Sequence, residues 1–122
     1  MVAKKSALTG FAKVLRARAL ALPETTEDFP WGERAFKVKG KAFVFLSTTD
    51  GLSFSMKLPK SRHQALMLPL AEPTHYGLGK HGWVTFRPAR LTKALEAQFE
   101  EWMLESYRAV APKKLSDALD RA

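Results

Sequence analysis

The sequence predicts an α+β fold, a two-layer domain in which an antiparallel five-stranded sheet has its helices packed on one face. Three observations lead to this prediction. Helical spacing of apolar residues occurs mainly toward the two ends of the chain, the middle holds several segments of strand period, and glycine or proline separates those segments. The predicted order is helix, three strands, helix, two strands and helix, over a single domain of residues 1–122. The other face of the sheet is then open.

The N-terminal segment predicts an amphipathic helix. Ser6 is a suitable N-cap, and apolar residues recur at helical spacing from Leu8 to Leu22, where Pro23 ends the pattern.

Residues 23–32 are expected to form a loop, because two prolines and a glycine occur among polar residues. Two aromatic residues, Phe29 and Trp31, are expected to hold this loop against the core. The region is also acidic. Its carboxylates could in principle pair for acid–base chemistry, but a solvated loop is the better interpretation; they are Glu24, Glu27, Asp28 and Glu33.

Three strand-period segments follow in quick succession and predict an antiparallel meander. They cover residues 34–39, 41–47 and 52–58, with Gly40 in the first turn and Asp50-Gly51 as a two-residue hairpin turn in the second. The segment 41–47 contains four consecutive apolar residues beginning at Phe43. It is therefore expected to be a central strand that is covered on both faces for part of its length.

The remaining elements are marked by proline, glycine and one long apolar stripe. The expected order is a short helix at 60–68, a short strand at 73–76, a glycine-rich connection at 77–82, a strand at 82–87 and a long helix from about Thr92. The apolar stripe of the long helix contains Leu95, Phe99, Trp102, Met103, Tyr107 and Val110, and its spacing is that of a core-facing stripe. Pro112 opens a last helical piece.

The composition is that of a basic globular protein with an uneven distribution of charge. The net charge is +8, and residues 34–93 alone contribute eleven basic and two acidic side chains. Charge concentrated in this way favours an encounter with a polyanion.

The chain has no cysteine, which excludes disulfides and zinc sites built on sulfur. It also has no membrane-spanning apolar run and no secretory leader, so a cytoplasmic location is expected.

The open sheet face is the best candidate site, because alternation places basic and hydroxyl-bearing side chains there. Lysine and arginine neutralise phosphates, serine and threonine donate hydrogen bonds to them, and Trp83 could stack on a base. A solvated face that uses lysine to discourage edge pairing is the competing interpretation. The strand residues assigned to this face are Lys37, Lys39, Ser53, Ser55, Lys57, Trp83, Thr85 and Arg87.

Other constellations are weaker. The segment Tyr76–Trp83 places three glycines around Lys80-His81, which suits either an anion-binding loop or a flexible connection, and it does not match the phosphate-binding loop pattern. The three histidines, His63, His75 and His81, lack the spacing of a metal site, so no metal and no cofactor is expected. No serine has the surroundings of a catalytic nucleophile, so the protein is not expected to be an enzyme.

Five stretches of the sequence resemble the MmcQ/YjbR family, in family order between residues 23 and 110. They are Phe29–Glu33, Phe36–Phe43, Ser55–Pro59, Lys80–Val84 and Glu105–Arg108. The resemblance implies a two-layer fold of the same element order, which is also similar to secretion chaperones and frataxin-type proteins. The family often has Asn-Lys-His-Trp before the last strand, whereas here Gly82 separates His81 from Trp83.

The resemblance also implies a function, since members are commonly described as DNA-binding on the basis of fold and basic surface. We therefore expect a nucleic-acid-binding protein, with DNA favoured over RNA and no membrane partner. The residues that match the family's basic and aromatic pattern are Lys37, Lys39, Lys41, Lys57, Lys80, His81 and Trp83, to which the face assignment adds Arg87. The alternative is a protein-interaction adaptor or chaperone-like protein without catalysis.

Overall fold

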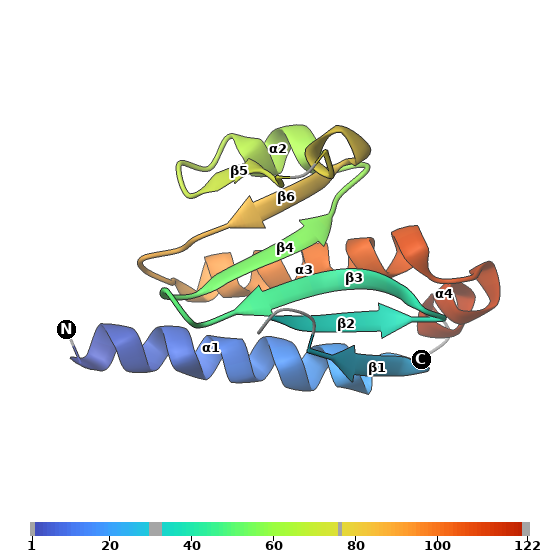
Figure 1. The fold of residues 1–122 in the computed structure, drawn as a ribbon, viewed down its shortest axis with the longest axis horizontal. Helices are drawn as coiled ribbons and strands as arrows, with labels where there is room; N and C mark the ends of the chain where they lie inside the picture. Colours follow the sequence, from blue (N-terminus) through green and yellow to red (C-terminus); the bar gives the residue numbers. More distant parts are fainter. Residues whose placement is uncertain (1, 30–32, 76, 121–122) are drawn as a thin grey trace.

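The computed structural model describes residues 2–29, 33–75 and 77–120 (Figure 1). The helices in this part of the chain are α1 (Val2–Ala21), α2 (Arg62–Leu66), α3 (Lys93–Val110) and α4 (Lys113–Asp120), with a short 3₁₀ helix η2 (Gly79–His81). The strands are β1 (Thr25–Asp28), β2 (Arg34–Val38), β3 (Lys41–Ser47), β4 (Ser53–Lys57), β5 (Ala71–Pro73) and β6 (Trp83–Phe86). All strand pairs are antiparallel, in the order β1-β2-β3-β4-β6-β5.

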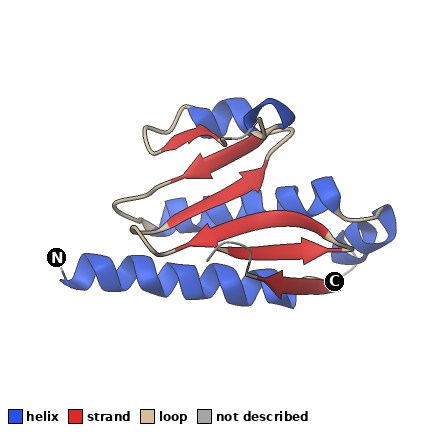
Figure 2. Ribbon diagram, viewed as in Figure 1, coloured by secondary structure: helices blue, strands red, loops and turns tan. Residues whose placement is uncertain are grey.

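The predicted α+β class and the two layers are confirmed (Figure 2). Helix α3 packs across β3 and β4, and α1 lies beside β1 and against α3. Figure 1 looks onto the opposite face of the sheet, with α3 behind the strands, and no described helix covers the face toward the viewer. The sheet therefore has one face in the core and one face that no described helix covers, which we call the open face.

Strand alternation builds the core. One cross-strand row of core residues runs through Phe36, Val44, Met56 and Val84, and the next runs through Leu46, Phe54 and Phe86. These side chains are almost completely buried against the apolar stripe of α3, where Phe99 lies with its ring centroid 4.8 Å from that of Phe54. Each row buries large apolar surfaces from several strands at once, which is the main stabilising contribution expected in such a fold.

A bulge in β3 explains its consecutive apolar residues. The register opposite β2 shifts between Phe36 and Lys37, so Phe43 is an extra residue in the ladder. Phe43 and Val44 are both buried in the core, whereas Phe45 lies on the open face against Trp83. β3 is central as predicted, but its apolar run reflects the bulge rather than a layer over each face.

The main error of the sequence prediction is the edge strand β1. Residues 23–32 were expected to form a loop, but Thr25–Asp28 pair with β2, and the sheet has six strands rather than five. The alternation of β1 is hidden because its two inward residues, Thr25 and Glu27, are both polar. The carboxylate of Glu27 accepts hydrogen bonds from Arg16 of α1 at 2.8 and 3.0 Å and from Arg34 of β2 at 2.7 Å. Two guanidinium groups thus stabilise the charge of this carboxylate. An apolar residue at the same position would have made the strand recognisable in the sequence.

The turns also differ from the expected boundaries. β2 ends at Val38, and Lys39 occupies the turn with a φ of 51°, followed by Gly40 at 79°, which is the geometry of a type I′ hairpin. Residues 48–52 form a longer connection than the expected Asp50-Gly51 hairpin turn, because β3 ends at Ser47 and β4 begins at Ser53. β5 ends at Pro73, where the predicted strand was to begin.

Phe29 does not pack onto the core. Its side chain is 58% exposed, and the guanidinium carbon of Arg34 lies 4.8 Å from its ring centroid. Trp31, the other aromatic residue assigned to the core, lies outside the described residues.

Helix α3 is fastened to distant parts of the chain by polar side chains as well as by its apolar stripe. The sequence predicts its start at about Thr92, and Thr92 is the N-cap. The hydroxyl of Thr92 accepts from the backbone N–H of Leu95 at 3.1 Å. Glu105 accepts from the backbone N–H groups of Lys60 and Ser61 at 2.9 and 3.0 Å, just before α2. α3 thereby positions the segment that connects β4 to α2.

Candidate nucleic-acid interface

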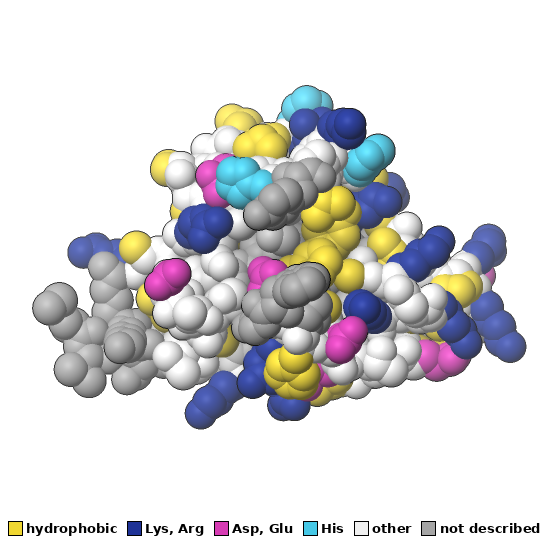
Figure 3. All heavy atoms as spheres, viewed as in Figure 1, with side chains coloured by type: hydrophobic (Ala, Val, Ile, Leu, Met, Phe, Trp, Pro, Cys, Tyr) yellow, Lys and Arg dark blue, Asp and Glu magenta, His cyan; other side chains and the backbone are white. Residues whose placement is uncertain are grey.

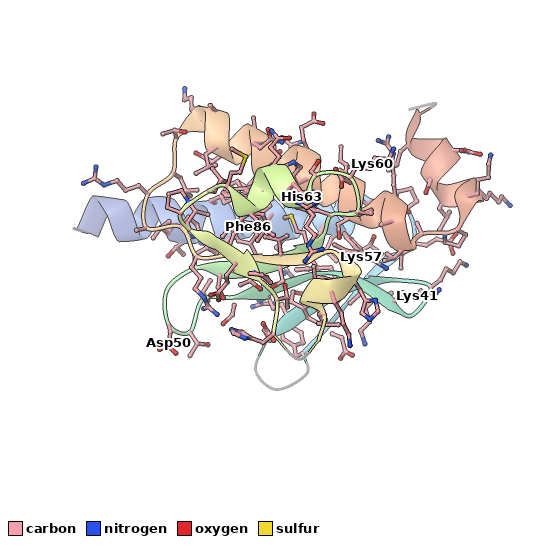
Figure 4. The ribbon with its side chains drawn as sticks, turned by 90° about the horizontal axis from the view of Figure 1, so that it is seen from above. Lys41, Asp50, Lys57, Lys60, His63 and Phe86 are labelled. Atoms are coloured by element: carbon pink, nitrogen blue, oxygen red, sulfur yellow. The ribbon has the colours of Figure 1, made fainter. Side chains whose placement is uncertain are left out.

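One end of the sheet collects the exposed lysines. β2 ends there and β3 begins there, and β4 ends beside the start of β6. Figure 4 shows Lys41, Lys57 and Lys60 toward this end and Asp50 at the other end. η2 lies directly before β6 and adds Lys80 and the exposed His81. We call Lys41, Lys57, Lys60 and Lys80 the lysine end.

The four side chains of the lysine end have no acidic partner among the described residues. Lys41, Lys60 and Lys80 are exposed, and Lys57 is half-buried. The carboxylate of Glu105 lies near Lys60, but it accepts hydrogen bonds from the backbone N–H groups of Lys60 and Ser61 and from the hydroxyl of Ser61, just before α2. The charge of these lysines is consequently directed to solvent. In Figure 3, Lys and Arg side chains gather on the right of the view, the side on which the lysine end lies.

The remaining basic candidates of the open face are paired with carboxylates. Lys37 lies 3.1 Å from Asp28, Lys39 lies 2.6 Å from Glu24, and Arg87 lies 3.2 Å from Glu72. The first two carboxylates belong to the acidic segment that was interpreted as a solvated loop. Asp28 lies in β1 instead, whereas Glu24 lies in the turn before β1, and both side chains are more than half exposed. Because β1 places this segment beside β2, much of the positive charge of β2 is locally compensated.

The pKa values of these carboxyl groups follow from their partners. The hydrogen bond from Arg16 lowers the pKa of Glu27 below its ordinary value, and Arg34 lowers it further. The hydrogen bond from Lys37 lowers the pKa of Asp28. Both groups are therefore ionised at neutral pH, and each presents a negative charge to the basic side chains beside it.

Trp83 is placed on the open face but is nearly buried. It pairs with Lys57 across β4 and β6, only 7% of it is exposed, and its ring centroid lies 5.4 Å from that of Phe45. The glycine before it has a φ of 91° and ends η2, which is the left-handed conformation that glycine adopts at low cost. The ring of Trp83 thus supports Phe45 and presents little free surface for stacking.

The open face also contains a cavity that sequence reasoning did not identify. Its volume is about 650 Å³, and its lining includes Ser55, Thr74 and Thr85 together with Phe45 and Leu78. The hydroxyl oxygen of Thr85 lies 2.7 Å from that of Ser55 and 2.9 Å from that of Thr74. Alternation predicted Ser55 and Thr85 on this face. Their contact with Thr74 depends on the pairing of β6 with both β4 and β5, which no local pattern indicates.

Among the described residues, the hydroxyl groups of Ser55, Thr85 and Thr74 hydrogen-bond to one another. Across the same residues, no three His, Asp or Glu side chains come close enough together to hold a metal ion.

The comparison with known proteins agrees with the fold and with the five sequence stretches. The family model described as YjbR matches residues 20–109. This chain belongs to the YjbR family. No curated protein matches it. The crystal structure of Deinococcus radiodurans protein DR2400, a DUF419 domain, is similar with a TM-score of 0.67 and 25% sequence identity, covering 88% of this chain and 83% of that one.

The YjbR match includes β1 to β6 and most of α3, and so it contains both the lysine end and the cavity. Within it, Glu105, Ser106 and Tyr107 each join α3 to a distant part of the chain. That family-like stretch has a structural role in this chain. None of the described helices is long and apolar enough to cross a membrane.

Proposed function

We propose that this protein binds nucleic acid by contacting phosphates with the lysine end. The observation that supports this function is the grouping of four lysines without acidic partners, within the described residues, at one end of the sheet. Ammonium groups directed to solvent can replace the counterions of a phosphate backbone, and the release of those ions is favourable. Base readout is not required for such binding, and the proposed contacts give affinity without sequence specificity.

The residues proposed to contact phosphate are not all those expected from the sequence. Lys37, Lys39 and Arg87 would have to exchange a carboxylate for a phosphate, so they are expected to contribute less than Lys41, Lys57 and Lys80. A protein-interaction adaptor stays the alternative, supported by the fold resemblance alone.

The test is fluorescence anisotropy of labelled DNA at several salt concentrations with two matched triple variants. One variant carries Lys41→Glu, Lys57→Glu and Lys80→Glu. The control carries Lys13→Glu, Arg90→Glu and Lys93→Glu, which are exposed positions outside the lysine end and lower the net charge by the same amount.

We expect the first variant to lose binding and the control to retain most of it. For wild type, three to four phosphate contacts give a slope of about −3 to −4 in log affinity against log salt on duplex DNA. Equal losses in both variants would reduce the effect to net charge. Absence of binding by wild type at low salt would overturn the proposal and turn attention to protein partners.

A further inference from the structure

We propose that the open-face cavity holds one unstacked nucleobase of a single strand whose phosphates contact the lysine end. This inference rests on the proposed function and specifies its ligand: the protein selects single-stranded over duplex nucleic acid. It is carried by the position, hydrogen-bonding capacity, walls and charge of the cavity.

The position of the cavity suits a nucleotide that spans it and the lysine end. Ser55 in its lining and Lys57 are two residues apart on β4 and point to the same face, a separation of about 6–7 Å along a strand. A volume of about 650 Å³ lies within the usual range for small-ligand sites.

The hydroxyl groups give the cavity both donors and acceptors. Ser55, Thr85 and Thr74 form a chain of two hydrogen bonds, with Thr85 in the middle. Three hydroxyls have three protons, and the two contacts within the chain use two of them. One proton therefore remains for an acceptor outside the chain, and oxygen lone pairs remain for a donor. The edge of a nucleobase offers both kinds of group side by side.

The walls of the cavity suit the face of a planar ring. Phe45 and Leu78 supply apolar surface, and the ring of Phe45 packs against the ring of Trp83 at a centroid distance of 5.4 Å. An aromatic side chain held in place can stack with any base, because each base has a π face. A base in a duplex is already stacked and paired, so it cannot use these groups.

The charge of the cavity argues against a phosphate inside it. Glu33, His75 and Arg87 contribute to the lining. Arg87 and His75 lie 3.2 and 3.6 Å from the carboxylate of Glu72. The cavity thus lacks the positive excess of the lysine end, and the two regions divide the nucleotide into an uncharged base and a charged phosphate.

The test compares three labelled DNA ligands with the same number of phosphates: a single strand, the same strand with abasic sites, and a duplex. Their affinities are measured by anisotropy for wild type and for Thr85→Val, which removes the central hydroxyl with little change of shape. Phe45→Leu is a second cavity variant that keeps an apolar side chain. Tyr107→Phe is the control, since it deletes a hydroxyl on the helix-covered side of the sheet.

We expect wild type to bind the single strand about tenfold more tightly than the abasic strand or the duplex. Both cavity variants should lose this preference while they keep the affinity for the abasic strand. The control Tyr107→Phe should keep the preference for the base-containing single strand. Equal affinity of wild type for the base-containing and abasic strands would overturn the cavity assignment while leaving phosphate binding intact. Failure of the proposed function is seen separately, as absence of salt-sensitive binding to the abasic strand.

Discussion

The hydroxyl of Ser106 on α3 accepts a hydrogen bond from the backbone N–H of Lys57 at the end of β4, at 2.8 Å. The same hydroxyl donates to the backbone carbonyl of Phe43, the extra residue of the β3 bulge. The ladder between β3 and β4 ends at the pair Val44 and Met56, so these two backbone groups are the next in line and Ser106 bridges them. A helix side chain thus satisfies the groups that the bulge leaves unpaired, next to the lysine end.

Ser106→Ala should therefore destabilise the protein by about 1–3 kcal/mol, because it leaves a buried donor and a buried acceptor without partners. The free energy of unfolding from urea titration measures this loss. Ser116→Ala, on α4, removes a serine hydroxyl outside this junction and should change stability by less. An equally small effect at Ser106 would show that water replaces the hydroxyl between the strands.

Glu27→Gln should destabilise the protein by about 1–3 kcal/mol at neutral pH, because the side chain is a charged acceptor for two arginines and only 11% of it is exposed. Since the pKa of Glu27 is lowered from its ordinary value of 4.5, this contribution is present above that value and is lost as the pH falls through the folded pKa. The difference between wild type and variant in urea unfolding should shrink below pH 4.5.

The control for this pH series is Asp28→Asn, whose carboxyl is 60% exposed and contacts one lysine. It should produce a much smaller difference at neutral pH. A difference between wild type and Glu27→Gln that stays constant down to pH 2 would contradict the ion-pair assignment.

Tyr107→Phe should lower stability near neutral pH by about 1 kcal/mol, because the phenol of Tyr107 donates to the carbonyl of Pro23 at 2.8 Å. Burial raises the pKa of Tyr107 from its ordinary value of 10.0. A raised pKa stabilises the folded state below pH 10, and the contribution is lost as the pH rises through the folded value. The melting temperatures of wild type and variant should converge above pH 10; parallel curves would contradict this assignment.

Lys39→Asn should stabilise the protein by up to about 1 kcal/mol. Asparagine is favoured in the first position of a type I′ turn, whereas lysine is strained at a positive φ. The gain is expected to exceed the loss of the exposed contact with Glu24. Thermal unfolding measures the effect, and Lys41→Asn is the control with the same charge change at a strand position. A lower melting temperature for Lys39→Asn would mean that the ion pair dominates the turn.

Most elements could be predicted because their signals are local. Pro23, Thr92 and Pro112 lie at or beside the observed ends of helices, and the alternation from Ser53 to Lys57 gives the two faces of β4 correctly. β1 could not be found in this way. Its two inward residues are polar, and the glutamate among them is compatible with burial only because Arg16 and Arg34 lie next to it in the folded protein.

The candidate site shows the same division. The sequence identified Lys41, Lys57 and Lys80, and it missed Lys60, which follows β4 after a proline that signals the end of the strand. It assigned Lys37 and Lys39 to the same role, because their carboxylate partners lie 9 and 15 residues earlier in the sequence. Those partners become neighbours only when β1 pairs with β2.

By itself, the sequence determined the α+β class, the YjbR resemblance, the faces of most strands and the excess of positive charge in the middle of the chain. These properties depend on the identity and spacing of residues close together in the chain. Only the tertiary structure decided which lysines are left without carboxylates among the described residues, and that Ser55, Thr74 and Thr85 meet in one cavity. Electrostatic compensation and cavity formation depend on distances through space, and the packing of β1, β5 and β6 sets those distances.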